Sequence, residues 1–205
     1  MKNLFVQSLL VFFLISCTSR KINFSDSTSL PAANEPEQLT NTAVYLSNDE
    51  QNLYAGIMAY RTSKGLSAIP LSSSLSKVAQ LHVQDLQENR PAKGRCNLHS
   101  WSKTYGNCCY TSDHSQAKCM WDKPRELTDY TGNGYEIAHW ASDGATANSS
   151  LQGWKNSSGH NAVMINKSIW KDVDWNAIGI GIHGEYSVVW FGKESDSAGR
   201  PTKCD

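Results

Sequence analysis

The 205-residue sequence lacks a surplus of either charge. Its 19 acidic and 19 basic residues give a formal net charge of zero at pH 7. Binding to nucleic-acid phosphates relies on a basic surplus, and so does binding to an anionic membrane surface. The composition therefore supports neither, and we expect no nucleic-acid partner. No internal repeat appears either, so the chain is not an array of stacked repeat units.

The sequence also lacks an apolar run long enough to cross a membrane, which takes about 20 residues. Its most apolar stretch, Leu4–Ile15, is shorter and follows one basic residue, Lys2. This layout is typical of a signal peptide. The stretch ends in Leu14-Ile15-Ser16-Cys17, which resembles a bacterial lipobox, whose cysteine is lipidated after cleavage. An ordinary signal peptide and an uncleaved anchor are the alternatives.

We therefore predict a lipoprotein signal peptide at residues 1–17 and a lipid on Cys17 that anchors the chain to a membrane of the bacterial cell envelope. Thr18 follows the cysteine where an Asp would favour the inner membrane. By resemblance to enterobacterial sorting, this favours the outer membrane. The lipid anchor makes the membrane the first expected partner.

Residues 18–46 show no sustained hydrophobic period and are rich in Ser, Thr, Asn and Pro. This composition predicts a flexible tether. A folded domain is expected at residues 47–193, because the sequence as a whole is 40% hydrophobic and periodic segments begin there. Residues 194–205 are interpreted as a C-terminal tail.

The domain opens with two predicted helices. Ser47 and Glu50 form a capping-box pattern for the first, and the second is expected to start at Ser72 or Ser74. His82 falls on the apolar stripe of the second helix. We interpret His82 as a core histidine rather than as a ligand.

No C-x-x-C pair occurs, which argues against a zinc site built from cysteines. Four cysteines instead lie in a segment that we interpret as a Cys-rich loop, residues 96–121: Cys96, Cys108, Cys109 and Cys119. In an extracytoplasmic protein this density predicts local disulfides. Three pairings are open, and the adjacent Cys108 and Cys109 are expected to bond elsewhere. Three states remain open for Cys204: a free thiol, a disulfide with one of the four, or a disulfide that links two molecules.

The second half predicts a helix that ends near Trp154, a break at Ser157–Gly159, and a further helical turn that follows His160. Two alternating apolar runs, residues 177–182 and 187–192, predict an antiparallel hairpin. Helices first and a hairpin last indicate an α+β fold.

Five segments in this order resemble the CAP superfamily, the SCP domain of cysteine-rich secretory proteins, antigen 5 and pathogenesis-related 1 proteins, and in particular its bacterial branch. The segments are Met58–Leu66, Leu75–Asp85, Tyr135–Ala138, Trp154–His160 and Ile178–Ile182. The resemblance covers about residues 50–193. It implies a three-layer α-β-α sandwich with a small antiparallel sheet between helices. It also implies a cleft with two histidines and two acidic residues.

By motif, His99 and His160 match the two histidines, and Glu136 matches the acid of the family's G-E-N motif. The chain departs from the pattern twice. Ile137 replaces the Asn of that motif, and Ser157 stands where the second acid would fall. The four-residue site is thus incomplete, and Ser157 is expected to line the same ligand-binding cleft.

Two neutral imidazoles suit Zn²⁺ or another divalent metal, so His99 and His160 are the predicted metal ligands. With two protein ligands, the affinity is expected to be modest. Glu136 is the candidate catalytic residue, as a general base acting on metal-bound water. No organic cofactor is expected.

The leading hypothesis is a CAP-domain lipoprotein that binds a small ligand, a lipid or a protein on a surface, with a divalent metal at the His-His-Glu cleft. One alternative is a metal-dependent hydrolase, a peptidase or cell-wall enzyme that uses Glu136 as base. The other is a structural surface adhesin in which the cleft is vestigial.

Overall fold

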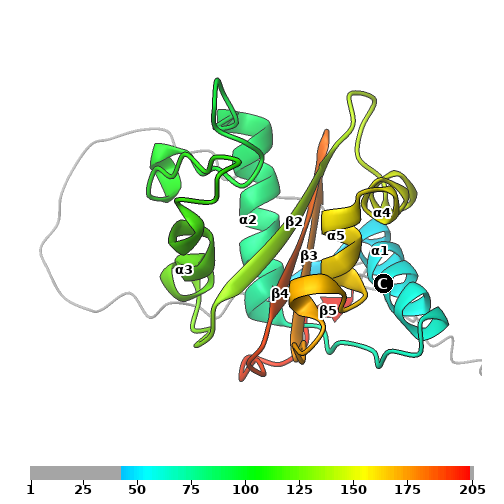
Figure 1. Cartoon of the computed structure of the whole chain (residues 1–205). Helices are drawn as coiled ribbons and strands as arrows, with labels where there is room; N and C mark the ends of the chain where they lie inside the picture. Colours follow the sequence, from blue (N-terminus) through cyan, green and yellow to red (C-terminus); the bar gives the residue numbers. More distant parts are fainter. Residues whose placement is uncertain (1–42, 204–205) are drawn as a thin grey trace, which may run out of the picture. The chain divides into compact units, whose positions relative to one another are not determined.

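A three-stranded antiparallel sheet separates two layers of helices in residues 43–203, the part of the chain that the computed structural model describes (Figure 1). The strands are β2 (Gly134–Trp140), β3 (Ala177–His183) and β4 (Tyr186–Gly192), in the order β2-β4-β3. This arrangement confirms the predicted α+β sandwich. The signal peptide, Cys17, most of the predicted tether and Cys204 lie outside the described residues.

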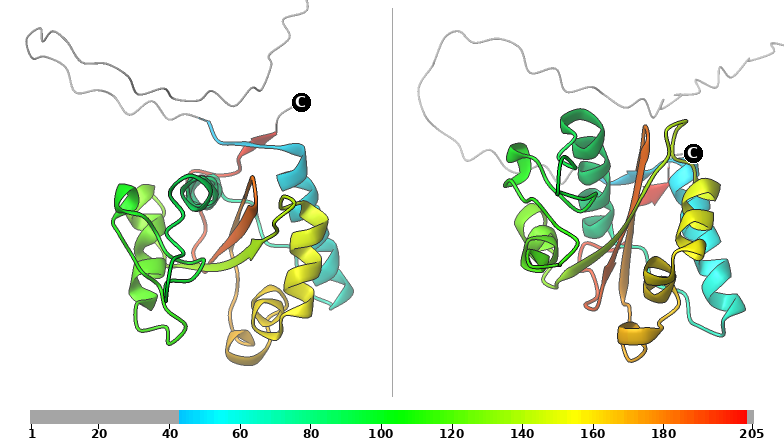
Figure 2. Two further views of the ribbon diagram at one scale, coloured as in Figure 1. Left: turned by 90° about the horizontal axis from the view of Figure 1, so that it is seen from above. Right: turned by 45° about the horizontal axis from the view of Figure 1, so that its top comes forward.

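One helical layer consists of α2 (Ser73–Asn89) and α3 (Ala117–Leu127), and the other of α1 (Asn48–Ser63), α4 (Ala147–Asn156) and α5 (Ser158–Met164). Figures 1 and 2 show the sheet between them. Alternate side chains of a strand point to opposite faces. On β4, Val188 and Trp190 therefore join the core under α2, whereas Val189 and Phe191 join the core under α1.

The predicted helix starts are confirmed. Ser47 and Glu50 form a reciprocal capping box at α1. The Ser72 hydroxyl oxygen accepts the Leu75 N–H at 2.9 Å and caps α2. Ser157 separates α4 from α5, as the predicted break requires. The two serine caps occupy backbone donors that the first helical turn leaves without partners.

Two glycines of β3 let α2 lie directly on the sheet. A Cβ atom added to Gly179 would come within 2.1 Å of the Leu75 carbonyl carbon, and one added to Gly181 within 2.5 Å of that of Ala79. Any side chain there would collide with the α2 backbone. The alternation of large and small residues in the predicted hairpin therefore serves helix packing, and it fixes the height of α2 above the sheet.

The Cys-rich segment is less loop-like than predicted. Residues 103–105 form a short 3₁₀ helix, η1 (Lys103–Tyr105), and α3 begins at Ala117, inside the predicted loop, and continues through residues whose composition is typical of turns. Pro124 lies within α3. Proline lacks a backbone N–H and disfavours the interior of a helix. Its presence therefore argued against predicting a helix here.

The disulfides are local, as predicted. Cys96 bonds to Cys109 and Cys108 to Cys119, so the adjacent pair does bond to different partners. Closing these two short loops restricts the unfolded chain and holds the segment between α2 and α3 in one conformation.

The folded region extends slightly beyond the predicted domain at both ends. β1 (Tyr45–Leu46) pairs in parallel with β5 (Thr202–Lys203), so the last residues of the predicted tether and part of the predicted tail are ordered. The carboxylate of Asp196, also in that tail, accepts hydrogen bonds from the hydroxyls of Ser72 and Ser74 at the N-terminus of α2. A short second 3₁₀ helix, η2 (Ser168–Trp170), follows α5.

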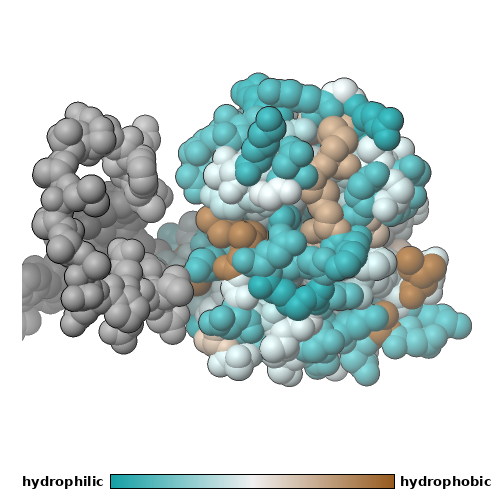
Figure 3. Space-filling model, turned by 90° about the vertical axis from the view of Figure 1, so that its left-hand side faces the viewer, coloured by the Kyte–Doolittle hydropathy of each residue, from teal (hydrophilic) through white to brown (hydrophobic). Residues whose placement is uncertain are grey.

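The face covered by α3 is mostly hydrophilic, with small separate apolar patches (Figure 3). Among residues 43–203, no helix combines the length and apolarity that a membrane crossing demands.

Candidate functional site

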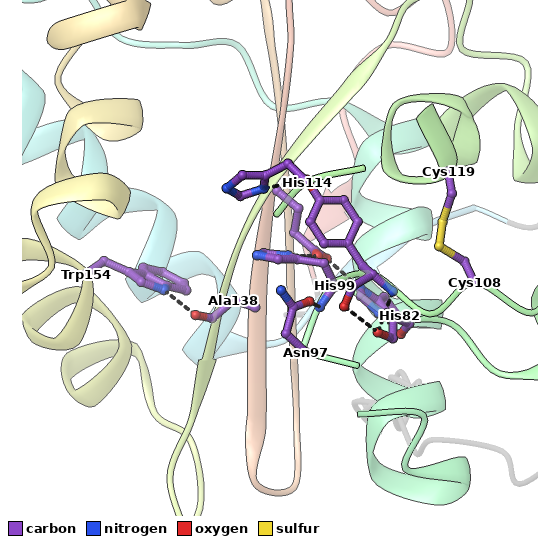
Figure 4. Close-up of polar contacts among 11 residues, drawn as sticks. His82, Asn97, His99, Cys108, His114, Cys119, Ala138 and Trp154 are labelled. Atoms are coloured by element: carbon purple, nitrogen blue, oxygen red, sulfur yellow. Dashed lines mark hydrogen bonds and ion pairs between the residues drawn. A yellow bond between two sulfur atoms is a disulfide. The ribbon is translucent and has the colours of Figure 1, made fainter. Parts of the chain in front are cut away.

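Glu136 forms the centre of the candidate site. It lies on β2, an edge strand, and its side chain is fully buried. One carboxylate oxygen, Oε1, is 2.5 Å from Nδ1 of His82, and the other, Oε2, is 2.7 Å from Nδ1 of His99 (Figure 4). Both oxygens are therefore occupied by histidines from two other segments.

His82 is a core histidine, as predicted, but it is also part of the site. It comes from α2 and is fully buried, and its Nε2 is 3.0 Å from the Ser100 carbonyl oxygen. Its ring stacks on Trp101 with centroids 4.0 Å apart. The sequence did not reveal the contact with Glu136, because helical periodicity places His82 on a buried face without showing what meets it there.

The loop that carries His99 is fixed at several points. The His99 N–H donates to the Asn97 side-chain oxygen at 3.0 Å. The buried Asp85 carboxylate accepts the Ser102 N–H at 2.8 Å and the Ser102 hydroxyl at 2.5 Å. The His99 side chain is 17% exposed. Within the described residues its Nε2 has no hydrogen-bond partner, which leaves this nitrogen available to a ligand.

His160 comes from the opposite helical layer, near the start of α5. The Trp154 indole N–H donates to the Ala138 carbonyl at 3.0 Å and holds α4 against β2 (Figure 4). At the far end of α5, the buried Arg61 guanidinium donates to the Met164 carbonyl at 2.7 Å. The first contact ties α4 to the sheet and the second ties the end of α5 to α1, so the two together fix the position of His160.

His160 makes no hydrogen bond to the other site residues, but it is close enough for them to affect its pKa. Burial, followed by the nearby His99 and His139, lowers the pKa of His160, while Glu136 acts in the opposite direction. His160 is therefore kept neutral near pH 7. Two of the four residues predicted for the site, His99 and Glu136, are thus in direct contact, and His160 lies within electrostatic range of both.

Ser157, the fourth predicted residue, is half-buried and ends α4; its N–H donates to the Trp154 carbonyl at 3.2 Å. Its hydroxyl makes no cap hydrogen bond to α5. The contacts of Ser157 are those of a helix break, and none joins it to Glu136.

Two further histidines lie near the site. His114 has a left-handed backbone, and its Nδ1 is 3.0 Å from the Tyr110 hydroxyl, whose ring packs edge-on against His99 (Figure 4). His139 lies three residues after Glu136 on β2, packs against Trp154, and has a buried Nε2 with no hydrogen-bond partner in the described region.

Opposing effects act on the Glu136 carboxyl. Burial alone would raise its pKa, because a charged group is poorly solvated inside a protein. The charges and hydrogen bonds of His82 and His99 outweigh burial and hold the pKa of Glu136 below its ordinary value. Glu136 is therefore ionised at neutral pH and is a weak base.

The donor set fits a metal only in part. His99 and His160 offer imidazole nitrogens, which suit Zn²⁺. However, no cluster of three or more His, Cys, Asp or Glu side chains within residues 43–203 is arranged to hold a metal ion. A metal here would rely on two protein ligands and complete its coordination with water or a bound ligand.

The structure is thus an α-β-α sandwich with a buried glutamate held between two histidines at the edge of its sheet. The sequence model of the cysteine-rich secretory protein (CAP) family matches residues 55–171, which is more than half of the chain. The chain belongs to this family, so the resemblance found in the sequence is confirmed.

Two solved structures share the fold. An outer surface protein from Borrelia burgdorferi is 22% identical, with a TM-score of 0.50, over 72% of this chain and 94% of that one. An extracellular SCP-domain protein from Bacillus anthracis is 17% identical, with a TM-score of 0.50, over 80% of this chain and 45% of that one. The comparison with curated proteins found no significant match.

We expect the stability of the domain to fall as the pH drops below about 6.5, in part through His139. Burial lowers the pKa of His139 in the folded state, so between the lowered value and the ordinary value of about 6.5 the unfolded chain binds more protons. Stability is therefore full above this window and decreases as the pH falls through it. His139→Phe should reduce the slope of unfolding free energy against pH between 7.5 and 5. The exposed control His183→Gln should leave it unchanged, and an unchanged slope in His139→Phe would contradict this role.

Proposed function

We propose that this CAP-domain protein acts outside the cytoplasm and binds a ligand at His99 and His160, with Glu136 behind them, rather than hydrolysing one. One observation carries the proposal: both carboxylate oxygens of Glu136 are already hydrogen-bonded to histidines inside the protein. The class of ligand is a small molecule, a lipid or a protein on a surface.

A general base must reach the proton that it removes and must hold that proton favourably. Glu136 meets neither requirement, since its side chain is fully buried and its pKa is lowered. Hydrolysis with Glu136 as the base would first require one of its two histidine bonds to break. These observations favour binding, the leading hypothesis from the sequence, over the alternative of a hydrolase that uses Glu136 as its base.

A divalent metal such as Zn²⁺ would bind to His99 and His160. The His99–Glu136 pair has the form of a carboxylate–histidine–metal arrangement, in which the carboxylate orients the ring of the ligand. When bound, the metal would supply a Lewis acid that attracts an oxygen or nitrogen of the ligand. His160, neutral because it is partly buried, would need no deprotonation to bind the metal.

A hydrolase with His99 as the base is the second candidate. A carboxylate that accepts the Nδ1–H of a histidine is also how proteins orient a histidine base, and His99 Nε2 has no partner among the described residues. This mechanism needs a substrate groove and an oxyanion stabiliser in addition, so binding remains the better-supported function.

Zinc titration tests the binding proposal. We expect the wild-type protein to release or absorb heat on zinc binding and the double variant His99→Ala, His160→Ala to lose this signal. His183→Ala, which alters an exposed histidine, should keep it. Identical heats in the wild type and the double variant would rule out a metal at this site. Incubation with casein and with peptidoglycan, each with and without chelator, separates the candidates, because turnover that is lost in His99→Ala would favour the hydrolase.

We also propose that a lipid on Cys17 anchors the domain in the bacterial cell envelope, with the outer membrane favoured. The support is the lipobox-like sequence Leu14–Cys17 together with the extracellular nature of the two fold relatives. If neither zinc nor any lipid binds, the remaining hypothesis is a structural surface adhesin.

The anchor predicts a clear change in fractionation. In a bacterial host, the full-length chain should sediment with membranes, whereas Cys17→Ser should not carry the lipid and should lose its acylated N-terminal peptide in mass spectrometry. Cys204→Ser serves as the control and should remain lipidated. An unmodified Cys17 in the mature wild-type chain would contradict the anchor.

A further inference from the structure

A cavity lies at the C-terminal end of α1, between the connector at residues 66–70 and the segment at residues 166–176. Its volume is about 490 Å³, within the range of small-molecule pockets, which is about 300–1,000 Å³. None of His99, Glu136 and His160 lines this cavity. It is therefore separate from the ligand site proposed above.

Arg61, in the last turn of α1, is the one deeply buried charged residue among those that line the cavity. It is only 5% exposed. Its Nε donates to the Ser67 carbonyl oxygen at 3.0 Å. Its Nη1 donates to the Met164 carbonyl oxygen and to the Asn166 side-chain oxygen, each at 2.7 Å. These three hydrogen bonds hold the guanidinium in one orientation.

The third guanidinium nitrogen, Nη2, has no hydrogen-bond partner within residues 43–203. It is not sealed inside the protein either, because the fully buried side-chain atoms without a partner there belong to other residues: Ser76, Trp101, His139 and Trp190. Since Arg61 lines the cavity and is otherwise buried, Nη2 lies on the cavity side. It offers two N–H donors to an occupant of the cavity.

The positive charge of Arg61 has no carboxylate beside it in the described part of the chain. Its three acceptors are uncharged oxygens. Burial lowers the pKa of Arg61, and no neighbouring acid acts in the opposite direction. By contrast, Lys123, the other buried Lys or Arg among the described residues, pairs with Glu126. Because an unpaired buried charge is costly, an anion in the cavity would gain a favourable interaction with Arg61.

The position of the cavity limits the charge of that anion. The C-terminal end of a helix carries a partial negative charge, and the cavity lies at this end of α1. Of the two exposed charged residues that line it, Lys171 is offset by Asp174. One Arg61 nitrogen beside a helix C-terminus suits a single negative charge better than a doubly charged phosphate.

The other walls determine the body of the ligand. They are largely apolar side chains: Leu66, Pro70, Val173 and Trp175. The Trp175 indole N–H donates to the Val163 carbonyl oxygen at 3.1 Å, which fixes the ring in place. A bare inorganic anion would leave these walls without a contact, whereas an organic acid would bury apolar surface against them.

We propose that this cavity binds a small organic carboxylate, with one carboxylate oxygen accepting from Arg61 Nη2 and the apolar body lying against Trp175. A hydrogen bond between two charged groups is stronger than one between neutral groups. Free organic acids and the C-termini of peptides share this chemistry. The site does not depend on the metal proposed for His99 and His160.

NMR titration of the ¹⁵N-labelled full chain tests the site with N-acetyl-leucine, its neutral amide N-acetyl-leucinamide, and acetate. We expect N-acetyl-leucine to shift the Arg61 side-chain and Trp175 indole signals saturably, with a Kd of about a millimolar for a ligand of this size. The amide lacks the charge and acetate lacks the apolar body, so each should bind at least about tenfold more weakly. No saturable shift, or an equal Kd for the amide, would overturn the proposal.

A second acid distinguishes the two sources of carboxylate. The free acid 4-methylpentanoate has the apolar body of leucine without a peptide group. An equal Kd for the two acids would support a site for free organic acids. Tighter binding of N-acetyl-leucine would support a site for peptide C-termini.

A matched pair of substitutions tests the charge without touching the core. Ala68 is exposed and lines the cavity. Ala68→Glu places a second carboxylate there and should raise the Kd for N-acetyl-leucine at least about tenfold above that of Ala68→Gln, which has the same shape and no charge. An equal Kd in the two variants would overturn the proposal.

Arg61→Met removes the donor itself at similar length. We expect this variant to lose saturable binding of N-acetyl-leucine, and a folded Arg61→Met protein that binds as tightly as the wild type would overturn the proposal. If Arg61→Met does not fold, the wild-type titrations and the Ala68 pair decide.

Discussion

The hydrogen bonds that Glu136 accepts from His82 and His99 determine how the pieces of this domain fit together. A buried carboxylate without partners costs several kcal/mol, so the fold must bring two donors to it. One donor requires α2 to lie at a fixed height on the sheet, which Gly179 and Gly181 allow. The other requires the loop after α2 to return to the edge strand, where hydrogen bonds to Asp85 and the disulfides of the Cys-rich segment hold it.

The same bonds shape the proposed function. A glutamate committed to two histidines orients them and takes no part in proton transfer itself, and this favours binding over hydrolysis. The groups left for a ligand are imidazole nitrogens from the two helical layers, His99 on one side of β2 and His160 on the other. Ser157, where the family pattern has an acid, adds no charge and serves as a helix break.

Local rules predicted much of the fold from the sequence. The caps at Ser47 and Ser72, the break at Ser157 and the final hairpin each depend on a few neighbouring residues, and all are present. The helix α3 could not be predicted, because Pro124 and its charged residues conceal an amphipathic pattern that only packing against β2 reveals. His82 likewise shows what local sequence patterns do not predict at the site. Periodicity correctly placed it in the core, but its bond to Glu136 joins residues 54 positions apart, and motif matching had singled out only His99, Glu136 and His160.

The free energy of unfolding of Glu136→Gln tests the central claim most directly. Glutamine has nearly the same size, but its amide oxygen can accept from only one of the two histidines, and its NH₂ group would face the ring nitrogen of the other. Leaving a buried polar group without its hydrogen bond typically costs about 1–3 kcal/mol, and we predict a loss of this size at pH 7 relative to the wild type. A loss below about 1 kcal/mol would contradict the account, because it would show that Glu136 is not the group that holds these histidines in place.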